Sequence, residues 1–329
     1  MVNNKKIVFV TEIGSKFKVT NDFDNMRTEY AWMLAFDAIH IPITEFKNIS
    51  GYDYVIIIWP KGETYLNAVG CHIGDKTDNR ISVLLQHDIV GTLKQNNDKV
   101  CYMQEGPSWF FNDYGIPEQF SYYNQIASSD IIFCHNEHDT KWYRGLFPGK
   151  DVQVIPSLLI EDSIKDVEWK PQDKTLIGGN LAKWYGGFQS YIVAEELGVE
   201  NWIPSMHNKR EYEDDIEDLR HLPYLNWLDW IKTLSTFKYA VHLMPTIAAG
   251  TFSLNCAYFG IPCIGNEKVD TQRLCFPELS VDVEDINKAR ILATLLKNDL
   301  DFYNECSDKA KLNYMEHFHI SKFKEKFNW

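Results

Sequence analysis

The 329-residue sequence lacks the marks of several large protein classes. No apolar run approaches the roughly 18 residues that a membrane-spanning helix needs, and the first apolar stretch, IVFV, is too short for a signal peptide. The seven cysteines are scattered without a CxxC pair, which disfavours both a zinc ribbon and a disulfide framework. We therefore expect a cytoplasmic protein with reduced thiols.

Basic charge is also scarce. The chain has 33 Lys and Arg against 46 Asp and Glu, a formal net charge of −13, which argues against a strongly basic nucleic-acid track and leaves a local basic patch open. The acidic run REYEDDIEDL at 210–219 is expected to be a solvated face or loop. Aromatic residues, by contrast, reach 14%, and their flat side chains suit sugars and bases as well as core packing.

The chain alternates β-rich runs with helical patterns, and it does so twice. In the first half, the pattern predicts strands at 5–14, 52–62, 98–107, 130–139 and 152–157, with helices at 21–40, 78–95 and 119–130. In the second half, it predicts a strand and glycine turn at 175–180 and strands at 201–206, 238–244 and 261–266, with helices at 189–198, 227–237, 252–260, 285–299 and 301–316. His87 and Asp88 fall within a predicted helix, so they are assigned to its surface.

Alternating strands and helices predict an α/β protein with two Rossmann-like, doubly wound parallel-sheet domains facing across a cleft. The stretch 157–173 is charged and has no clear period, so it is interpreted as a linker. We expect an acceptor-side domain at 1–160 and a ligand-binding domain at 161–329, with the C-terminal helix packing back on the first domain.

Two small-residue stretches of the second half suit phosphate binding. Gly250, Thr251 and Ser253 open an apolar helix, where free N–H groups and the helix dipole favour an anion; a plain helix cap is the alternative. Gly178, Gly179 and Asn180 directly follow a predicted strand, although GxGxxG is absent and the motif alone is weak.

Polar and aromatic residues of the first half lie at or after the ends of predicted strands. Glu105, before Gly-Pro, is a candidate general base on an acceptor hydroxyl, or a carboxylate that satisfies backbone N–H groups. Trp109 suits stacking on a sugar or base, and Arg27, His135 and Asn136 are candidate acceptor contacts; a capped helix start is the alternative for Arg27. No His, Cys or Asp spacing is diagnostic of a metal, so none is predicted.

The second half carries a family resemblance. Residues 221–265 resemble the sugar-nucleotide segment of the GT-B glycosyltransferases, including an Ala-x-x-Gly-x-Pro ending, here Ala257, Gly260 and Pro262. Residues 178–197 resemble the opening loop of their donor domain. The stretches QEGPSWFFNDY (104–114) and AAGTFSLNCAYFGIPCIG (248–265) are similar to those of bacteriophage-encoded glycosyltransferases, some of which modify hydroxymethylated bases in phage DNA.

This resemblance implies a set of site residues. Lys183 matches the basic residue that helps to hold the diphosphate, and Tyr224 and Asn226 lie where the base is expected. The implied donor site comprises Gly178, Gly179, Asn180, Tyr224, Asn226, Met244, Thr246, Gly250, Thr251 and Ser253. Many retaining members carry an acidic pair just before the Gly-x-Pro turn. Ile247 and Asn255 stand at those positions here, which leaves the donor sugar and the stereochemical outcome open.

The resemblance implies transfer of a sugar from a nucleotide-diphosphate sugar, most simply a UDP-sugar, to a hydroxyl acceptor, with no cofactor or metal and with Glu105 and Lys183 as catalytic groups. One acceptor hypothesis is a 5-hydroxymethylated pyrimidine in double-stranded phage DNA, in the host cytoplasm; a cell-surface glycan or small molecule is the other. A nucleotide-sugar epimerase and a non-catalytic two-domain binding protein stay open as alternatives, as does the oligomeric state.

Overall fold

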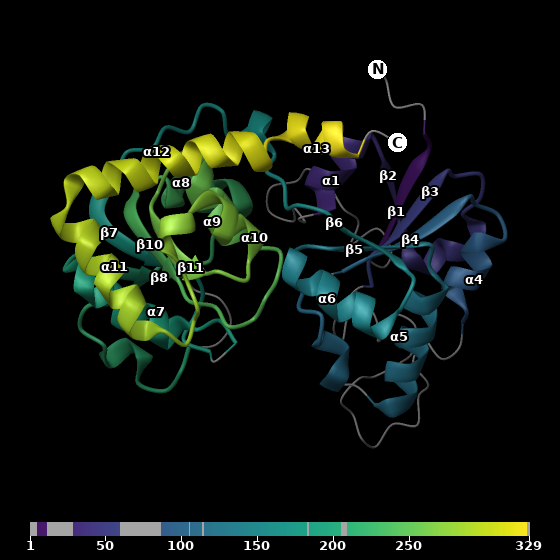
Figure 1. Ribbon diagram of the computed structural model, residues 1–329, viewed down its shortest axis with the longest axis horizontal. Coiled ribbons are helices and arrows are strands. Elements are labelled where there is room, and N and C mark those ends of the chain that lie inside the picture. The colour runs from purple at the N-terminus through teal and green to yellow at the C-terminus, as the bar shows by residue number, and fades with distance from the viewer. Residues whose placement is uncertain are drawn as a thin grey trace. The chain divides into compact units, whose positions relative to one another are not determined.

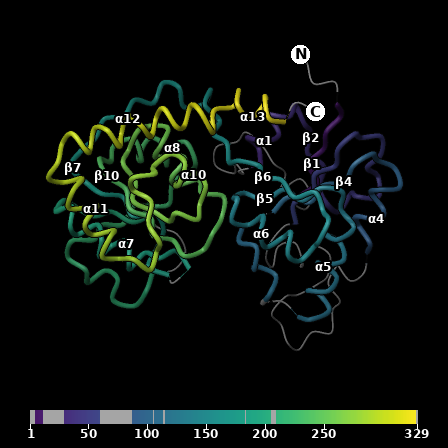
Figure 2. Tube along the Cα trace, viewed as in Figure 1, coloured from purple at the N-terminus to yellow at the C-terminus, as the bar shows by residue number. Residues whose placement is uncertain are grey.

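The computed structural model describes residues 5–11, 29–59, 87–104, 106–113, 115–182, 184–204 and 209–327 (Figures 1 and 2). These residues form two compact units. In the described chain the first unit extends to Ile155 and includes Lys326 and Phe327, whereas the second runs from Pro156 to Glu325. Each unit is built on its own six-stranded parallel sheet.

The first unit contains most of the elements that alternation predicts. Its strands are β1 (Ile7–Thr11), β2 (Ile39–Pro42), β3 (Tyr54–Ile57), β4 (Lys99–Met103), β5 (Ile131–Cys134) and β6 (Asp151–Val154). Its helices are α1 (Glu29–Phe36), α4 (Ile89–Lys94), α5 (Ile116–Ser128) and α6 (Glu137–Leu146). The strand order is β2-β1-β3-β4-β5-β6, with every neighbouring pair parallel. The five residues of β1 are all buried, as expected where helices cover both faces of a parallel sheet.

Two helix predictions in this unit differ from the structure at one end. The predicted helix at 21–40 ends at Phe36; Asp37 adopts a left-handed conformation (φ 52°), and the chain then enters β2, which the sequence pattern missed. Within the range predicted as a helix at 78–95, α4 begins only at Ile89, because the Asp88 carboxylate caps it by accepting a 2.8 Å hydrogen bond from the Gly91 N–H. The placement of His87 and Asp88 within a helix was therefore wrong.

The second unit repeats this architecture (Figure 1). Its strands are β7 (Gln172–Ile177), β8 (Glu200–Ile203), β9 (Leu219–His221), β10 (Phe237–His242), β11 (Cys263–Asn266) and β12 (Ser280–Val281). Its helices are α7 (Gly187–Ala194), α8 (Trp227–Leu234), α9 (Thr251–Phe259), α10 (Asp270–Cys275), α11 (Ile286–Asn298), α12 (Leu300–His317) and α13 (Ile320–Lys326). The order is β12-β11-β10-β7-β8-β9, again all parallel. The short elements β9, β12, α10 and α13 were not predicted, because each has too few residues to show a period.

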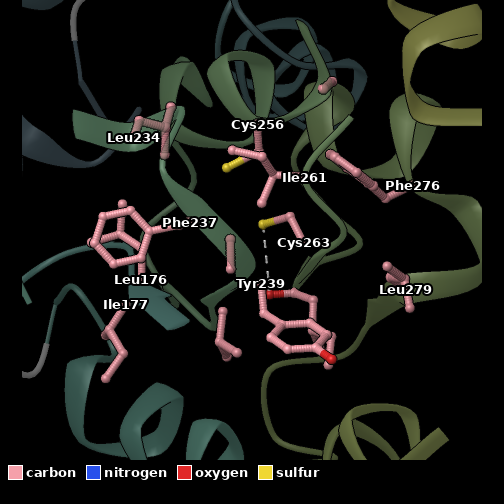
Figure 3. Packing of buried hydrophobic residues seen from close by; sticks show 14 of the residues in the cluster. Leu176, Ile177, Leu234, Phe237, Tyr239, Cys256, Ile261, Cys263, Phe276 and Leu279 are labelled. Carbon is pink, nitrogen blue, oxygen red and sulfur yellow. Dashed lines mark hydrogen bonds between the residues drawn. The ribbon is translucent and has the colours of Figure 1, made fainter. Parts of the chain in front are cut away.

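The core of the second unit lies between its sheet and its helices. Figure 3 shows Phe237 and Tyr239 of β10 with Leu176 of β7 and Cys263 of β11 among the buried side chains. Helices α7 and α11 pack together, and α9 packs against both α10 and α12. Burial of each large apolar side chain stabilises the fold by about 1.5–3 kcal/mol, so this core holds the ends of the strands in place.

The strand order fixes where each sheet can bind a ligand. In open α/β sheets the ligand lies at the carboxyl ends of the strands, where the chain reverses its direction of progress across the sheet. In the second unit this topological switch point lies between β7 and β10, which pair in parallel with Ile177 beside Val241. In the first unit it lies between β1 and β3.

Candidate functional site

The switch point of the second sheet brings together the two small-residue stretches that the sequence singled out. Gly178, Gly179 and Asn180 follow the carboxyl end of β7, and Met244 and Thr246 follow the neighbouring end of β10. The Gly178 N–H donates a 2.9 Å hydrogen bond to the Val241 carbonyl, so the two chain segments leave the sheet side by side. Residues 66 positions apart in sequence thus line one edge (Gly178 and Met244).

The loop after β10 is fixed by hydrogen bonds to α7. The Ser190 hydroxyl accepts a 2.8 Å hydrogen bond from the Leu243 N–H and donates one of 2.8 Å to the Gly186 carbonyl. Gly186 has φ +63° and lies so close to the Leu243 carbonyl that a side chain would collide with it. On the other side, the Asn266 amide of β11 donates a 2.8 Å hydrogen bond to the Met244 carbonyl. The backbone at the switch point is therefore held by contacts from α7 and from β11.

The start of α9 forms the second part of this edge. Gly250 precedes the helix in a left-handed conformation (φ +70°), and its carbonyl accepts hydrogen bonds from Ser253 (3.2 Å) and Thr271 (2.8 Å). The Ser157 hydroxyl also hydrogen-bonds the neighbouring Ala249 carbonyl. Thr251 is exposed at the first helical position. An exposed helix start with free N–H groups and a positive dipole end is suited to an anion.

These contacts divide the predicted helix-start residues into two kinds. Ser253 is buried, and its hydroxyl is engaged with Thr271 (2.7 Å) and the Gly250 carbonyl, so in this structure it stabilises the turn. Thr251 is the residue of the pair that faces solvent. A direct ligand contact for either residue stays a prediction.

A half-buried histidine that the sequence did not single out ends β10 at the same edge. The His242 ring lies 2.6 Å (at Cγ) from where a Cβ on Gly178 would stand, and its centroid lies 4.8 Å from that of Phe252 in an edge-on arrangement. Burial lowers the pKa of His242 to about 4. A lone histidine in the apolar run KYAVHLM carries no spacing signal, so only the sheet order reveals its position beside the glycine turn.

The residues expected near a base lie at the start of α8, after the edge strand β9. Tyr224 is 82% exposed and therefore free to stack on a flat ligand. The Asn226 side chain caps α8, accepting a 2.9 Å hydrogen bond from the Asp229 N–H and donating one of 3.0 Å to the Asp229 carboxylate. Helix α8 contacts α9 through Trp230 and Phe252, whose ring centroids lie 6.4 Å apart.

In the first unit, the predicted acceptor contacts follow β4 and β5, which are neighbours in the sheet. Trp109 is 42% exposed, in keeping with a stacking surface. His135 and Asn136 are buried: the His135 ring stacks on Trp32 at 5.4 Å, and the Asn136 amide donates a 3.1 Å hydrogen bond to the Asp139 carboxylate. Their buried contacts show a structural contribution, and their contact with an acceptor stays a prediction.

Three buried polar groups at the carboxyl edge of the first sheet lack hydrogen-bond partners among the described residues. They are the Thr11 hydroxyl at the end of β1, the Trp59 indole N–H just after β3, and the Gln104 side-chain carbonyl just after β4. Leaving such a group unpaired costs about 1–3 kcal/mol. Their concentration on three neighbouring strands marks this edge as the polar, incompletely satisfied end of the unit.

Three predicted residues lie outside the described part of the chain: Arg27, Glu105 and Lys183. Their assignments stay predictions. The described residues contain no group of three or more His, Cys, Asp or Glu placed to hold a metal ion. Within the same residues, no helix is both long and apolar enough to cross a membrane.

A separate pocket of about 370 Å³ lies in the first unit between α5, α6 and the segment after β4. Its walls are largely aromatic, with Phe111 stacked on Tyr122 at 3.9 Å and Tyr123 packed against Phe147 at 4.7 Å. None of its lining residues is charged, so this pocket is poorly suited to a diphosphate.

Two all-parallel, doubly wound six-stranded sheets in one chain define the GT-B fold, with two Rossmann-like units. Solved structures with the same fold confirm this assignment. Phage T4 alpha-glucosyltransferase, in complex with UDP and a 13-mer DNA containing an HMU base, matches with a TM-score of 0.66 and 12% identity over 98% of both chains. The sucrose-phosphate synthase of Thermosynechococcus elongatus matches with a TM-score of 0.59 and 9% identity, again over 98% of both chains.

A third match is more partial. A mutant of S. aureus TarM, in complex with Fondaparinux, alpha-GlcNAc-glycerol and UDP, gives a TM-score of 0.57 at 12% identity, over 83% of this chain and 54% of the other. No family model and no curated protein matches the sequence. The predicted likeness to GT-B and phage glycosyltransferases is thus confirmed at the level of fold.

Proposed function

We propose that this protein is a glycosyltransferase that moves a sugar from a nucleoside-diphosphate sugar to a hydroxyl acceptor. The observation that carries the proposal is the convergence of Gly178-Gly179 with the exposed start of α9 around the β7/β10 switch point. This is where an open α/β sheet binds a nucleotide, and the free N–H groups of a helix start suit its diphosphate. The solved structures with the same fold that are described with UDP or UDP-glucose support UDP as the carrier.

In this proposal the second unit binds the donor. Backbone N–H groups near Gly178 and at Thr251 face the diphosphate, Lys183 supplies positive charge to its oxygens, and Tyr224 stacks on the base. Asn226, Met244 and Thr246 line the same site. Helix-start N–H groups are already oriented before reaction, so they stabilise the charge that develops on the leaving group without reorganising.

The first unit holds the acceptor in this proposal. The acceptor oxygen forms a bond to the anomeric carbon while the bond from that carbon to the diphosphate oxygen breaks, and Glu105 takes the hydroxyl proton. Trp109, Arg27, His135 and Asn136 position the acceptor. The unpaired groups of Thr11, Trp59 and Gln104 support a polar ligand at this edge, since a hydroxylated molecule or its ordered water has the donors and acceptors that they lack.

The proposed acceptor is a 5-hydroxymethylated pyrimidine in double-stranded DNA, supported by the phage-like sequence stretches and by the similar fold of a protein described with HMU-containing DNA. A cell-surface glycan or small molecule is the competing acceptor. The first 155 residues favour it, because they contain 14 basic and 19 acidic residues and phosphate contacts require positive charge.

The first test is the effect of UDP on thermal unfolding. A ligand at 100 times its Kd stabilises the folded state by about 2.7 kcal/mol, so UDP should raise the Tm by several degrees. If neither UDP nor any other nucleoside diphosphate or nucleotide sugar shifts the Tm, the proposal fails. Mass spectrometry after incubation with UDP-glucose then separates transfer to an acceptor from epimerisation of the donor and from binding without turnover.

The second test addresses the acceptor. Duplex DNA with hydroxymethylcytosine, hydroxymethyluracil or unmodified pyrimidine is incubated with protein and UDP-glucose, and the nucleosides are analysed by mass. A hexose on the hydroxymethylated bases alone supports the DNA acceptor. Absence of transfer to DNA, with release of UDP in the presence of a glycan or small-molecule acceptor, supports the alternative.

A further inference from the structure

The side chain of His242 lies in the space that Gly178 leaves open. In the β10–β11 ladder, His242 is the register partner of Gly265, and on the β7 side the residue beside it is Gly178. A Cβ on Gly178 would stand 2.6 Å from the imidazole Cγ. Gly178 carries no positive φ, so at this position the glycine is required for space rather than for an unusual backbone conformation.

The imidazole is half-buried and makes no hydrogen bond within the part of the chain that the structure describes. Neither ring nitrogen is both fully buried and unpaired, so both are accessible to a ligand or to water. The aromatic contact with Phe252 fixes the ring from the α9 side. Because His242 is the last residue of β10, its ring lies at the carboxyl end of that strand, and no hydrogen bond within the described residues occupies its nitrogens.

The ring is neutral at physiological pH. Burial is the sole cause of its low pKa of about 4, and no charged side chain among the described residues contributes to it. A neutral imidazole offers one donor and one acceptor and brings no positive charge. It therefore suits a hydroxyl group, which can both donate and accept, better than a phosphate, which favours cationic partners.

We propose that the imidazole of His242 hydrogen-bonds a hydroxyl group of the bound nucleotide sugar. This inference rests on the proposed function and assigns His242 to the donor site as a binding residue that selects for a hydroxyl at the switch point. Both the ribose and the transferred sugar carry such hydroxyls, and the choice of ligand in the test separates these two sources.

The experiment measures the Kd of UDP and of UDP-glucose by isothermal titration calorimetry at pH 7.5. Two variants, His242→Phe and His242→Leu, fill the space beside Gly178 with a side chain that cannot form a hydrogen bond. A third, His242→Gln, has both a hydrogen-bond donor and an acceptor at this position. His317→Phe, at an exposed position on α12, is the matched control. The Tm of each variant without ligand verifies that it is folded.

Loss of one hydrogen bond should weaken binding about 3- to 10-fold in the Phe and Leu variants, with partial recovery in the Gln variant and no change in the control. Weakening of both ligands assigns the hydroxyl to the ribose, and weakening of UDP-glucose alone assigns it to the transferred sugar. Either result supports the inference.

Unchanged Kd values for both ligands in folded Phe and Leu variants would overturn the inference while the proposed function stands. A second result would also overturn it: a tenfold rise in the affinity of the wild-type protein for UDP between pH 8 and pH 5.5 that is absent in the Phe variant. Such a rise would mean that a protonated His242 binds the diphosphate. Wild-type protein that binds neither ligand refutes the proposed function itself.

Discussion

The imidazole of His242 occupies the space that a side chain at Gly178 would need, because a Cβ on Gly178 would come within 2.6 Å of the imidazole Cγ. The two residues lie on neighbouring strand ends, and neither carries a signal of this pairing in the sequence. The substitution Gly178→Ala should therefore force the ring from its place, at a cost of about 1–3 kcal/mol in the free energy of unfolding. Urea unfolding measures this cost.

A double-mutant cycle identifies the cause. In a His242→Ala background the added Cβ of Gly178→Ala has room, so most of its cost should disappear. Gly179→Ala is the matched control, because Gly179 has φ +130° and its strain does not depend on the ring. Strictly additive costs of Gly178→Ala and His242→Ala would contradict the steric account.

Stability should depend on pH through His242. The folded state holds the imidazole neutral with a pKa of about 4, whereas the unfolded chain takes up a proton near its ordinary pKa of 6.5. The unfolded state thus binds more protons between these values, so the free energy of unfolding falls as the pH drops from 6.5 towards 4. Between pH 7.5 and pH 5, this group should contribute a loss of about 1–2 kcal/mol.

Urea unfolding at both pH values, in wild type and in His242→Phe, isolates this contribution because other titrating groups are common to both. The variant should lose less stability than wild type, and His317→Phe should behave like wild type. An equal loss in His242→Phe and wild type would show that the ring titrates normally in the folded protein.

The hydroxyl of Thr271 should support the start of α9. It donates to the Gly250 carbonyl at 2.8 Å and shares a 2.7 Å hydrogen bond with Ser253. Thr271→Val keeps the shape but removes both of these hydrogen bonds, each worth about 0.5–1.5 kcal/mol, so it should cost about 1–3 kcal/mol and also weaken UDP binding. Thr294→Val is the control. The exposed Thr294 hydroxyl donates a hydrogen bond to the Arg290 carbonyl within α11, so its loss should change neither stability nor UDP affinity appreciably. Undiminished UDP affinity in a destabilised Thr271→Val would separate this turn from the donor site.

Tyr314 should matter for stability alone. Its buried hydroxyl donates a 2.7 Å hydrogen bond to the Glu161 carboxylate, which ties α12 to the segment before β7, and burial raises the pKa of this phenol well above its usual range. Tyr314→Phe should lower the free energy of unfolding by about 1–3 kcal/mol, since the hydrogen bond has a charged acceptor. The Kd for UDP, measured by calorimetry on the folded variant, should stay at the wild-type value. A large change in that Kd would mean that α12 communicates with the switch point.

The longer elements could be predicted from the sequence because each carries its own periodic pattern. The buried strand β3 (YVII) is a continuous apolar run, β10 has the buried centre YAV, and α11 and α12 show a helical period over many residues. The errors lie at helix ends. The left-handed conformation of Asp37 follows the end of one helix, and the Asp88 side chain caps the start of another. Apolar periodicity does not reveal either feature.

The sequence by itself determined the fold class and the segments that are candidates for ligand binding, because strand–helix alternation and small residues after strands are local properties. Only the tertiary structure decided which segments meet. Parallel pairing of β7 with β10 brings Gly178 beside His242 and sets both near the start of α9, although the chain between them forms two further strands. Strand order depends on the packing of the whole sheet, and no short stretch of sequence encodes it.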